Sequence, residues 1–380
     1  MIYLDAAATT KPYPEVIDAV TSALWENWAN PSSNYSIAHD AKMHIEHTRT
    51  QFAHDMNCDP SELIFTSSGC ESNSLAISGF LMGHSGYDLF TSCLEHASIN
   101  EMVDKLPTMI GRVNIPVDAI GQISPDALRS LIIERQKYSN RKPFVSISGA
   151  NSEIGVIQDI KALAEVVHQY NGIIHCDAVQ LFPERQLDVK DLGVDMLSIS
   201  AQKFHGIRGA AILYVRDGIE ITPIIYGSQE DHRRGGSYNT AAIAGMGEAL
   251  GITRLNSVKL RVKALRDRML DKLLQIPDTR LNGPKINCNR LANNISLTID
   301  GVSAERLVAL CDMMGVIIAK GSACKSYEPT PSPALLGIGL THEQALSTIR
   351  ITLDEFITEE DIDQAVNIIA KLVERIRSDE

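Results

Sequence analysis

The sequence predicts an α/β protein with a mostly parallel sheet, followed by a smaller α+β region. Between residues 63 and 215, short apolar runs alternate with helical patterns, which is typical of parallel strands joined by covering helices. After residue 256 the pattern changes to a long amphipathic helix and then to strands and helices in mixed order. The 380 residues are enough for one large or two medium domains.

The first part of the chain begins with two helices. Pro14 suits the first turn of a helix that we expect to end near Ala29. The apolar side chains that share one face of this helix are Val16, Ile17, Val20, Leu24 and Trp28. A second helix is expected at 41–56, and Asp59-Pro60 follows it as a chain breaker. The strands expected next are 63–66, 89–92, 112–115, 143–147, 173–176, 196–200 and 210–215, with helices at 75–80, 125–136 and 161–170.

The last third of the chain opens with an amphipathic helix at 257–276. Its apolar stripe is expected to contain Leu260, Leu265, Met269, Leu273 and Ile276. Strands at 294–299, 316–319 and 349–353 and helices at 304–313 and 359–377 follow. We place the boundary between the two parts of the chain within 245–276.

Composition argues against several classes of protein. The formal net charge of −12 disfavours direct nucleic-acid binding, because neutralising phosphates needs a basic face. No apolar stretch approaches the ~20 residues of a membrane span, and the N-terminus lacks the features of a secretory signal. The seven cysteines form no CxxC pair, which favours free thiols in a reducing cytoplasm over disulfides or a metal site.

Lys203 is the residue whose position most strongly suggests chemistry. It follows the apolar run 196–200, and a lysine at the mouth of a buried strand loses hydration, which lowers its pKa. A second apolar run, 172–176, ends in Asp177, with Gln180 three residues on. A lysine and an aspartate at the ends of successive strands suit pyridoxal phosphate (PLP), which needs a Schiff-base lysine and a carboxylate for its ring nitrogen.

Cys324 adds a second candidate nucleophile. The small residues Gly321-Ser322-Ala323 precede it, and the polar, proline-rich run 325–331 follows. This composition predicts an exposed loop, as a group that transfers sulfur would need. We expect Lys325 to stabilise the Cys324 thiolate through its nearby charge.

With these residues the chain resembles the cysteine desulfurases of the NifS/IscS-like group, within the class V aminotransferases. The resemblance implies a fold-type-I PLP-dependent transferase, with a mostly parallel seven-stranded sheet and helices on both faces. It implies a large PLP-binding domain over 13–255 and a small α+β domain over 1–12 and 256–380, which carries the Cys324 loop and Arg350. The matching motifs are Tyr3-Leu4-Asp5-Ala6-Ala7-Ala8-Thr9-Thr10, Asn30-Pro31-Ser32-Ser33, Phe65-Thr66-Ser67, Glu95-His96, Asn151-Ser152-Glu153-Ile154-Gly155, Asp177-Ala178-Val179-Gln180, Lys203, Gly321-Ser322-Ala323-Cys324 and Arg350.

The resemblance also assigns a phosphate site. Gly69 and Cys70 match the phosphate-cradling pair at a helix N-terminus, where backbone N–H groups bind anions. By itself the segment 66–72 also suits a plain strand–turn–helix with N-caps. Ser200 matches a phosphate-contacting serine. Ser237 matches a hydroxyl residue that reaches the phosphate of the partner in a homodimer.

The cofactor ring and the substrate have their own matches. His96 matches the histidine that stacks on the ring and moves protons, and Asp177 the carboxylate on the ring nitrogen. The residues matched to the ring hydroxyl oxygen are Gln180 and Asn151, the latter of which also suits a simple turn. Arg350 matches the arginine that grips the substrate α-carboxylate through its planar fork, with Asn30 assisting.

Five positions depart from the family pattern. Cys70 lacks the usual hydroxyl, and Gln202 replaces a histidine before the lysine, so it can donate a hydrogen bond but carries no charge. The other departures are Ala6 for Asn, Tyr35 for His and Asp354 for Gly.

The resemblance implies an L-cysteine desulfurase that yields L-alanine and a Cys324 persulfide. The persulfide would pass to a protein acceptor or scaffold serving iron–sulfur assembly, tRNA thiolation or DNA phosphorothioation. Two alternatives stay open. One is another class V enzyme, a selenocysteine lyase or an aminotransferase, which Cys324 disfavours. The other is a non-catalytic partner-binding scaffold, which would be expected to lose Lys203 or Asp177.

Overall fold

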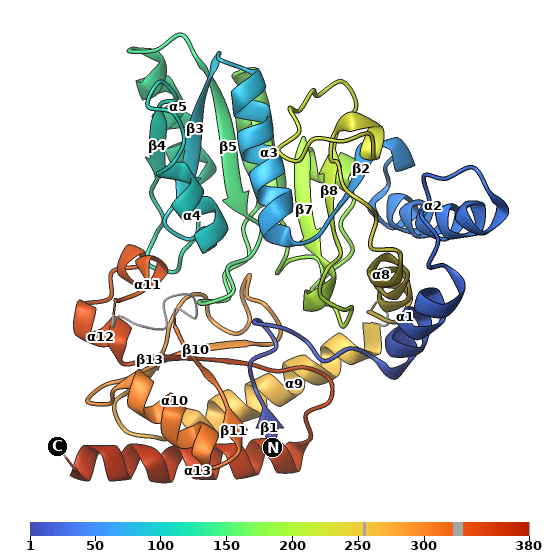
Figure 1. Cartoon of the computed structure of the whole chain (residues 1–380). Helices are drawn as coiled ribbons and strands as arrows, with labels where there is room; N and C mark the ends of the chain where they lie inside the picture. Colours follow the sequence, from blue (N-terminus) through green and yellow to red (C-terminus); the bar gives the residue numbers. More distant parts are fainter. Residues whose placement is uncertain (254–255, 322–329, 380) are drawn as a thin grey trace.

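A seven-stranded sheet forms the centre of the larger part of the protein (Figure 1). The computed structural model describes residues 1–253, 256–321 and 330–379. In spatial order the strands are β2 (Leu63–Thr66), β8 (Ala211–Val215), β7 (Met196–Ser200), β6 (Ile173–Asp177), β5 (Lys142–Ser148), β3 (Tyr87–Ser92) and β4 (Arg112–Ile115). Strand β8 runs antiparallel to both neighbours and every other pair is parallel, so the predicted mostly parallel sheet is confirmed.

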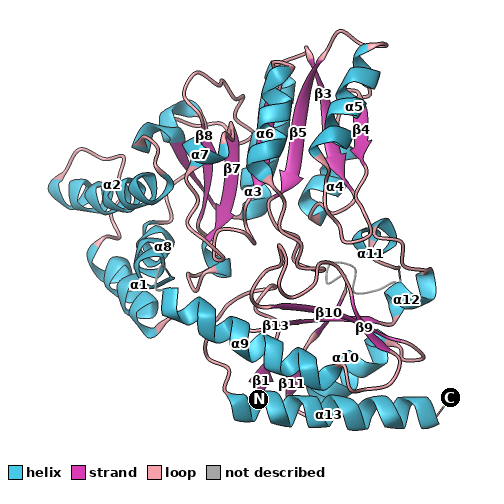
Figure 2. Ribbon diagram, turned by 180° about the vertical axis from the view of Figure 1, so that it is seen from behind, coloured by secondary structure: helices cyan, strands magenta, loops and turns pink. Residues whose placement is uncertain are grey.

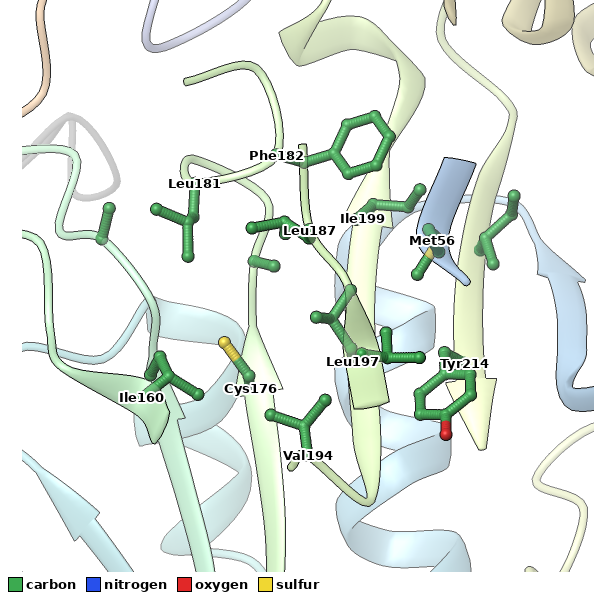
Figure 3. Packing of buried hydrophobic residues seen from close by; sticks show 14 of the residues in the cluster. Met56, Ile160, Cys176, Leu181, Phe182, Leu187, Val194, Leu197, Ile199 and Tyr214 are labelled. Atoms are coloured by element: carbon green, nitrogen blue, oxygen red, sulfur yellow. The ribbon is translucent and has the colours of Figure 1, made fainter. Parts of the chain in front are cut away.

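Helices cover both faces of this sheet. Helices α3 (Gly69–Gly83) and α4 (Ala97–Val103) lie on one face (Figure 1), and α5 (Pro125–Gln136) and α6 (Ile160–Gln169) on the other (Figure 2). Strands β6 and β7 are therefore buried on both sides, as central parallel strands are. Figure 3 shows their side chains, among them Cys176 and Leu197, packed within the larger core.

Three further helices of the first part pack on one another. Helix α8 (Thr240–Thr253) lies against α1 (Pro14–Glu26) and α2 (Ser36–Met56). The short elements are the helix α7 (Val189–Leu192) and the 3-10 helices η1 (Pro60–Glu62), η2 (Ala201–Lys203) and η3 (Glu230–His232).

A second, smaller sheet lies below the first in Figure 1. It is antiparallel, in the order β12 (Ala319–Lys320), β13 (Thr348–Thr352), β10 (Asn294–Ile299) and β9 (Thr279–Leu281). The N-terminal strand β1 (Ile2–Tyr3) pairs in parallel with β11 (Val316–Ile317) beside it. The helices of this region are α9 (Asn256–Leu273), α10 (Ala304–Met313), α11 (Pro333–Gly337), α12 (His342–Leu346) and α13 (Glu359–Ser378).

Two predicted apolar faces were wrong in part. In α1 the side chains of Ile17 and Leu24 are 46% and 62% exposed, and Trp28 lies beyond the helix, which ends at Glu26. The reason is tertiary: α1 packs closely on α8 over Gly245, where an added Cβ would lie 2.6 Å from Val20 Cγ2. The face of α1 that is buried against α8 therefore includes fewer side chains than the sequence predicted.

In α9 the expected stripe residue Leu260 is 73% exposed, whereas Val262 and Leu270 are buried with the other stripe residues. The predicted strand 316–319 is two strands, β11 and β12, which join different sheets. In the part of the chain that the structure describes, no helix is long and apolar enough to span a bilayer.

Candidate active site

A cavity of about 690 Å³ opens at the carboxyl ends of the central parallel strands. Its walls come from the segments that follow β2, β3, β5, β6 and β7, and open α/β sheets bind their ligands at this edge. Arg350 on β13 lines it as well, together with Ala7 and Ala8. The cavity therefore collects side chains from segments far apart in the sequence.

Most of the predicted site residues meet there. Those that line the cavity are Gly69, Cys70, His96, Asn151, Asp177, Gln180, Ser200, Gln202, Lys203 and Arg350. Asn30 and Ser237 are exposed at other places on this chain. Cys324 lies outside the described residues, but Gly321 and Thr330, at the two ends of that gap, both line the cavity.

Lys203 lies in η2, directly after β7, where it is largely withdrawn from water. Its Nζ donates hydrogen bonds to the backbone oxygens of Ala7 at 2.7 Å and Ala8 at 2.8 Å. Burial, reinforced by the charge of Arg350, lowers the pKa of Lys203 to about 8. About a tenth of this amine is therefore neutral, and nucleophilic, at pH 7, far more than for a lysine with the ordinary pKa of 10.5.

Asp177 ends β6 and accepts hydrogen bonds at both carboxylate oxygens. Oδ1 accepts from the backbone N–H of Val179 at 3.0 Å, and Oδ2 accepts from Asn73 Nδ2 at 2.7 Å. The sequence analysis missed Asn73, which is buried and lines the cavity. A signal was present, because residues four apart share a helix face and Asn73 follows Gly69 by four in α3.

His96 follows β3 and is the N-cap residue of α4. Its side chain is exposed and lines the cavity. The backbone N–H of Ser98 donates to His96 Nδ1 at 3.1 Å, and Ser98 Oγ lies 2.9 Å from the same nitrogen. The first turn of α4 therefore contacts the ring at Nδ1.

The first turn of α3 has the features of an anion site. At Gly69 an added Cβ would lie 2.8 Å from Val179 Cγ2, so only glycine leaves this wall open. Ser68 caps the helix by accepting from the backbone N–H of Glu71 at 3.2 Å, and the thiol of Cys70 is exposed. The glycine and the helix N-terminus suit a phosphate group.

Arg350 is 4% exposed and lies in β13, between β10 and β12. One end of its guanidinium donates to Asp5 Oδ1 at 2.7 Å. Its Nε is buried without a hydrogen-bond partner in the described part of the protein. A buried unsatisfied donor is unfavourable, and Arg350 lines the cavity, so its guanidinium suits a carboxylate ligand.

Asn151 and Gln180 also make contacts that shape the cavity wall. Asn151 Oδ1 accepts from the backbone N–H groups of Glu153 at 2.8 Å and Ile154 at 2.9 Å, while Nδ2 donates to Leu94 O at 2.8 Å. Asn151 thus has the turn role that the sequence left open. Gln180 Nε2 donates to Ala7 O at 3.0 Å, the oxygen that Lys203 also contacts.

Two buried glutamates lie beside the cavity, and the sequence motifs predicted no role for either of them. Burial raises the pKa of Glu95 to about 7, although Ser92 Oγ at 2.6 Å and Ser148 Oγ at 2.8 Å donate to it. Burial likewise raises the pKa of Glu153 to about 7, and its Oε2 accepts from Ser332 Oγ at 2.5 Å. Both carboxyls are therefore partly protonated near neutral pH.

Asn30 does not take part in this cavity. Its Oδ1 accepts from the backbone N–H of Ser32 at 3.0 Å, which closes a local turn. The predicted contact with substrate is therefore not made within this chain. Arg234, from the same segment as Ser237, donates to Glu71 Oε1 at 2.7 Å and so holds that segment near the start of α3.

A match to the family described as aminotransferase class-V covers residues 2–365. The chain belongs to this family. It is 35% identical over 383 residues to the cysteine desulfurase IscS of Methanosarcina thermophila, covering 99% of this chain and 93% of the relative. It is 37% identical over 386 residues to the cysteine desulfurase IscS of Dictyoglomus turgidum, covering 99% and 95%.

Solved structures agree. A NifS-like protein from Rickettsia africae has a TM-score of 0.89 and 31% identity, with coverage of 98% of this chain and 99% of that one. A structure described as SspA in complex with cysteine has a TM-score of 0.81 and 28% identity, with coverage of 93% and 99%. The predicted fold type and the cysteine desulfurase resemblance are confirmed, and the protein is a PLP-dependent member of the family.

The residues present fit that cofactor. The glycine-walled helix N-terminus suits its phosphate, Asp177 its ring nitrogen and the low-pKa amine of Lys203 its aldehyde. The unsatisfied Nε of Arg350 fits the carboxylate of an amino-acid substrate bound next to it.

Proposed function

We propose that the protein releases sulfur from L-cysteine, forms L-alanine and holds the sulfur on Cys324 as a persulfide. The Cβ–S bond of the substrate breaks and an S–S bond to the Cys324 sulfur forms, so cysteine and a thiol become alanine and a persulfide. The observation that carries the proposal is the convergence of Lys203, Asp177 and Arg350 on one cavity, beside both ends of the segment that contains Cys324.

Each side chain has a distinct task in this reaction. When bound, PLP supplies a cationic ring that withdraws electrons from the bonds at the substrate carbons. Asp177 would hold the ring nitrogen in its protonated form, since its carboxylate is itself fixed by Val179 and Asn73. The neutral fraction of Lys203 would bind the cofactor covalently and, once free, accept a proton.

Arg350 orients the substrate through its α-carboxylate. Its contact with Asp5 helps to fix the guanidinium, and its Nε has no hydrogen-bond partner among the described residues. Gln180, Asn151 and Ser200 would contact the cofactor from the walls that they already form. The similar structure described as a complex with cysteine supports this amino acid as the substrate.

We further propose that the protein is a homodimer with its active sites at the subunit interface. Ser237 does not line the cavity of its own chain, and the large apolar side chain of nearby Tyr226 is 79% exposed. Both features suit a segment that reaches a second subunit. Size-exclusion chromatography with light scattering tests this, and a fully active monomer would refute it.

The sulfur acceptor would be a cytoplasmic protein or scaffold, serving iron–sulfur assembly, tRNA thiolation or DNA phosphorothioation. We also propose that the chain divides into a large domain over 13–255 and a small one over 1–12 and 256–380. In this division β1 belongs to the small domain, where it pairs with β11.

The experiment that tests the function compares two cysteine variants. Cys324→Ser should keep the bound cofactor and make no persulfide, because a serine hydroxyl cannot take the sulfur. Cys288→Ser is the matched control, since Cys288 is an exposed thiol that does not line the cavity. Alanine production and mass spectrometry of the peptide containing Cys324 are the measurements. Wild-type turnover by Cys324→Ser would refute the proposal.

A further inference from the structure

Asp177 and His96 are connected by hydrogen bonds through Asn73 and Ser98. Asn73 Nδ2 lies 2.7 Å from Asp177 Oδ2 and 3.3 Å from Ser98 Oγ. Ser98 Oγ lies 2.9 Å from His96 Nδ1, and the backbone N–H of Ser98 donates to the same nitrogen at 3.1 Å. Residues from α3, α4 and the end of β6 thus form one continuous network.

The donors and acceptors of this network determine where its hydrogens lie. The Asp177 carboxylate accepts at both oxygens, so Asn73 must present its NH₂ group, which carries two hydrogens. The second hydrogen is directed at Ser98 Oγ, and the Ser98 hydroxyl is then free to donate its own hydrogen to His96 Nδ1. Nδ1 is therefore an acceptor, and the neutral ring carries its proton on Nε2.

The orientation of Asn73 has a cost that points to a role. Its side chain is 1% exposed, and among the described residues Oδ1 has no hydrogen-bond partner. A buried, unsatisfied carbonyl oxygen is unfavourable. The bond to the Asp177 carboxylate offsets this cost, because hydrogen bonds to ionised groups are stronger than neutral ones. The network is thus anchored at its carboxylate end.

We propose that Asn73 and Ser98 are positioning residues that fix Asp177 and His96 relative to each other and hold His96 as a proton donor through Nε2. The inference rests on the proposed function, from which the role of Asp177 is taken. Asp177 and His96 line the same cavity and would both contact the cofactor there, so this relay fixes the two groups relative to one ligand. Protonation of Nδ1 would break the bond from the Ser98 backbone N–H and would require the Ser98 hydroxyl to turn and accept, so the relay favours the neutral imidazole.

The other titratable groups around His96 are shared by every variant compared below. From the remaining walls of the cavity, among the described residues, they are Cys70, Cys93, Glu95, Glu101, Asp104, Glu153, Lys203 and Arg350. Their combined field acts on His96 in the wild type and in each variant. A difference between variants therefore isolates the contribution of the relay.

The test is an NMR titration of the His96 ring nitrogens. The full chain is labelled with ¹⁵N-histidine, measured with bound cofactor and after its removal, and assigned with His96→Gln. In the wild type Nδ1 should be unprotonated and Nε2 protonated. In Ser98→Ala the titration midpoint of His96 should rise by about half to one pH unit, because one of two donors that oppose Nδ1 protonation is lost.

Three further variants complete the comparison. Ser98→Thr keeps the hydroxyl and should restore the wild-type midpoint. Asn73→Ala should raise the midpoint less than Ser98→Ala and weaken cofactor binding about tenfold, since Asp177 loses its charge-assisted donor. Ser130→Ala is the control, because Ser130 is an exposed serine in α5 whose Oγ donates only locally to Asp126 O. It should change neither quantity.

An Nδ1–H tautomer in the wild type would overturn the proposal, as would an unchanged midpoint in a folded Ser98→Ala. If Ser98→Ala does not fold, an unchanged His96 titration midpoint in Asn73→Ala would overturn the proposal instead. The titration is independent of turnover, so the two proposals can fail separately. Expected midpoints in a protein that makes no alanine from cysteine would refute the proposed function and leave the relay standing.

Discussion

Replacing Glu153 with glutamine should flatten the dependence of thermal stability on pH. Burial raises the pKa of this carboxyl from its ordinary 4.5 to about 7. The folded protein then binds a proton that the unfolded chain releases, so stability is lost as pH rises from 4.5 to 7. At 1.36 kcal/mol for each unit of pKa, the loss is at most about 3 kcal/mol.

The corresponding change in melting temperature follows from the length of the chain. An unfolding entropy of about 2.1 cal/mol/K per residue makes 3 kcal/mol equivalent to about 4 °C for a protein of this size. Between pH 5 and pH 8 the wild type should therefore lose up to about 4 °C more than Glu153→Gln, measured by calorimetry on the cofactor-loaded protein. The amide is neutral at both pH values, which removes this proton linkage.

The slope, rather than the absolute stability, is the quantity to compare. Glutamine Oε1 can accept from Ser332 Oγ as the carboxylate does, but its NH₂ group would face Gly321, where Glu153 Oε1 has no partner in the described structure. The unpaired NH₂ group of the glutamine lowers the stability of the variant by a similar amount at every pH. Glu343→Gln, at an exposed position in α12, is the matched control. Equal slopes for Glu153→Gln and the wild type would refute this account of Glu153.

The site supports further predictions. Recombination of PLP with the cofactor-free protein should accelerate as pH rises through about 8, where the neutral form of Lys203 becomes the major one; a rate independent of pH in stopped-flow absorbance would contradict this. Gly69→Ala should weaken cofactor binding about tenfold or more, because the added Cβ would lie 2.8 Å from Val179 Cγ2. Wild-type affinity in a fluorescence titration would show that Val179 moves to accommodate the methyl group. Arg350→Lys should raise KM for cysteine far more than it lowers kcat, since lysine cannot form two parallel hydrogen bonds with a carboxylate; an unchanged KM would exclude the proposed contact. Lys325→Ala should slow turnover mainly near neutral pH by raising the pKa of the Cys324 thiol, so identical pH–rate profiles would remove that role.

The sequence predicted the strands of the central sheet well because local composition determines them. Strand β7, for example, is a short apolar run with buried surroundings on both faces, and its predicted bounds agree with the structure. The buried faces of the outer helices were harder to predict from the sequence. In α1 the predicted apolar face included Leu24, yet the buried side is set by the close approach of α8 at Gly245, which no pattern within α1 records.

The same distinction applies to the site. Lys203 and Asp177 follow apolar strands, and the carboxyl ends of parallel strands meet at one edge, so their convergence was predictable. Asp5, Asn73 and Glu153 were not given roles because their importance comes from partners distant in sequence. Asp5 contacts Arg350 across 345 residues, and Asn73 contacts Asp177 across 104.

The buried glutamates affect the charge of the cavity. With Glu95 and Glu153 protonated, the inner charges are Lys203, Arg350 and Asp177, with Asp5 paired to Arg350, while Glu101 and Asp104 add two exposed negative charges. Ionisation of both glutamates would add two negative charges in a region of low dielectric, and the charge of Glu153 acts directly on Arg350. Those charges would compete with the substrate carboxylate for the guanidinium. Burial keeps them largely neutral up to pH about 7, so the same packing that costs stability at higher pH leaves Arg350 available for substrate.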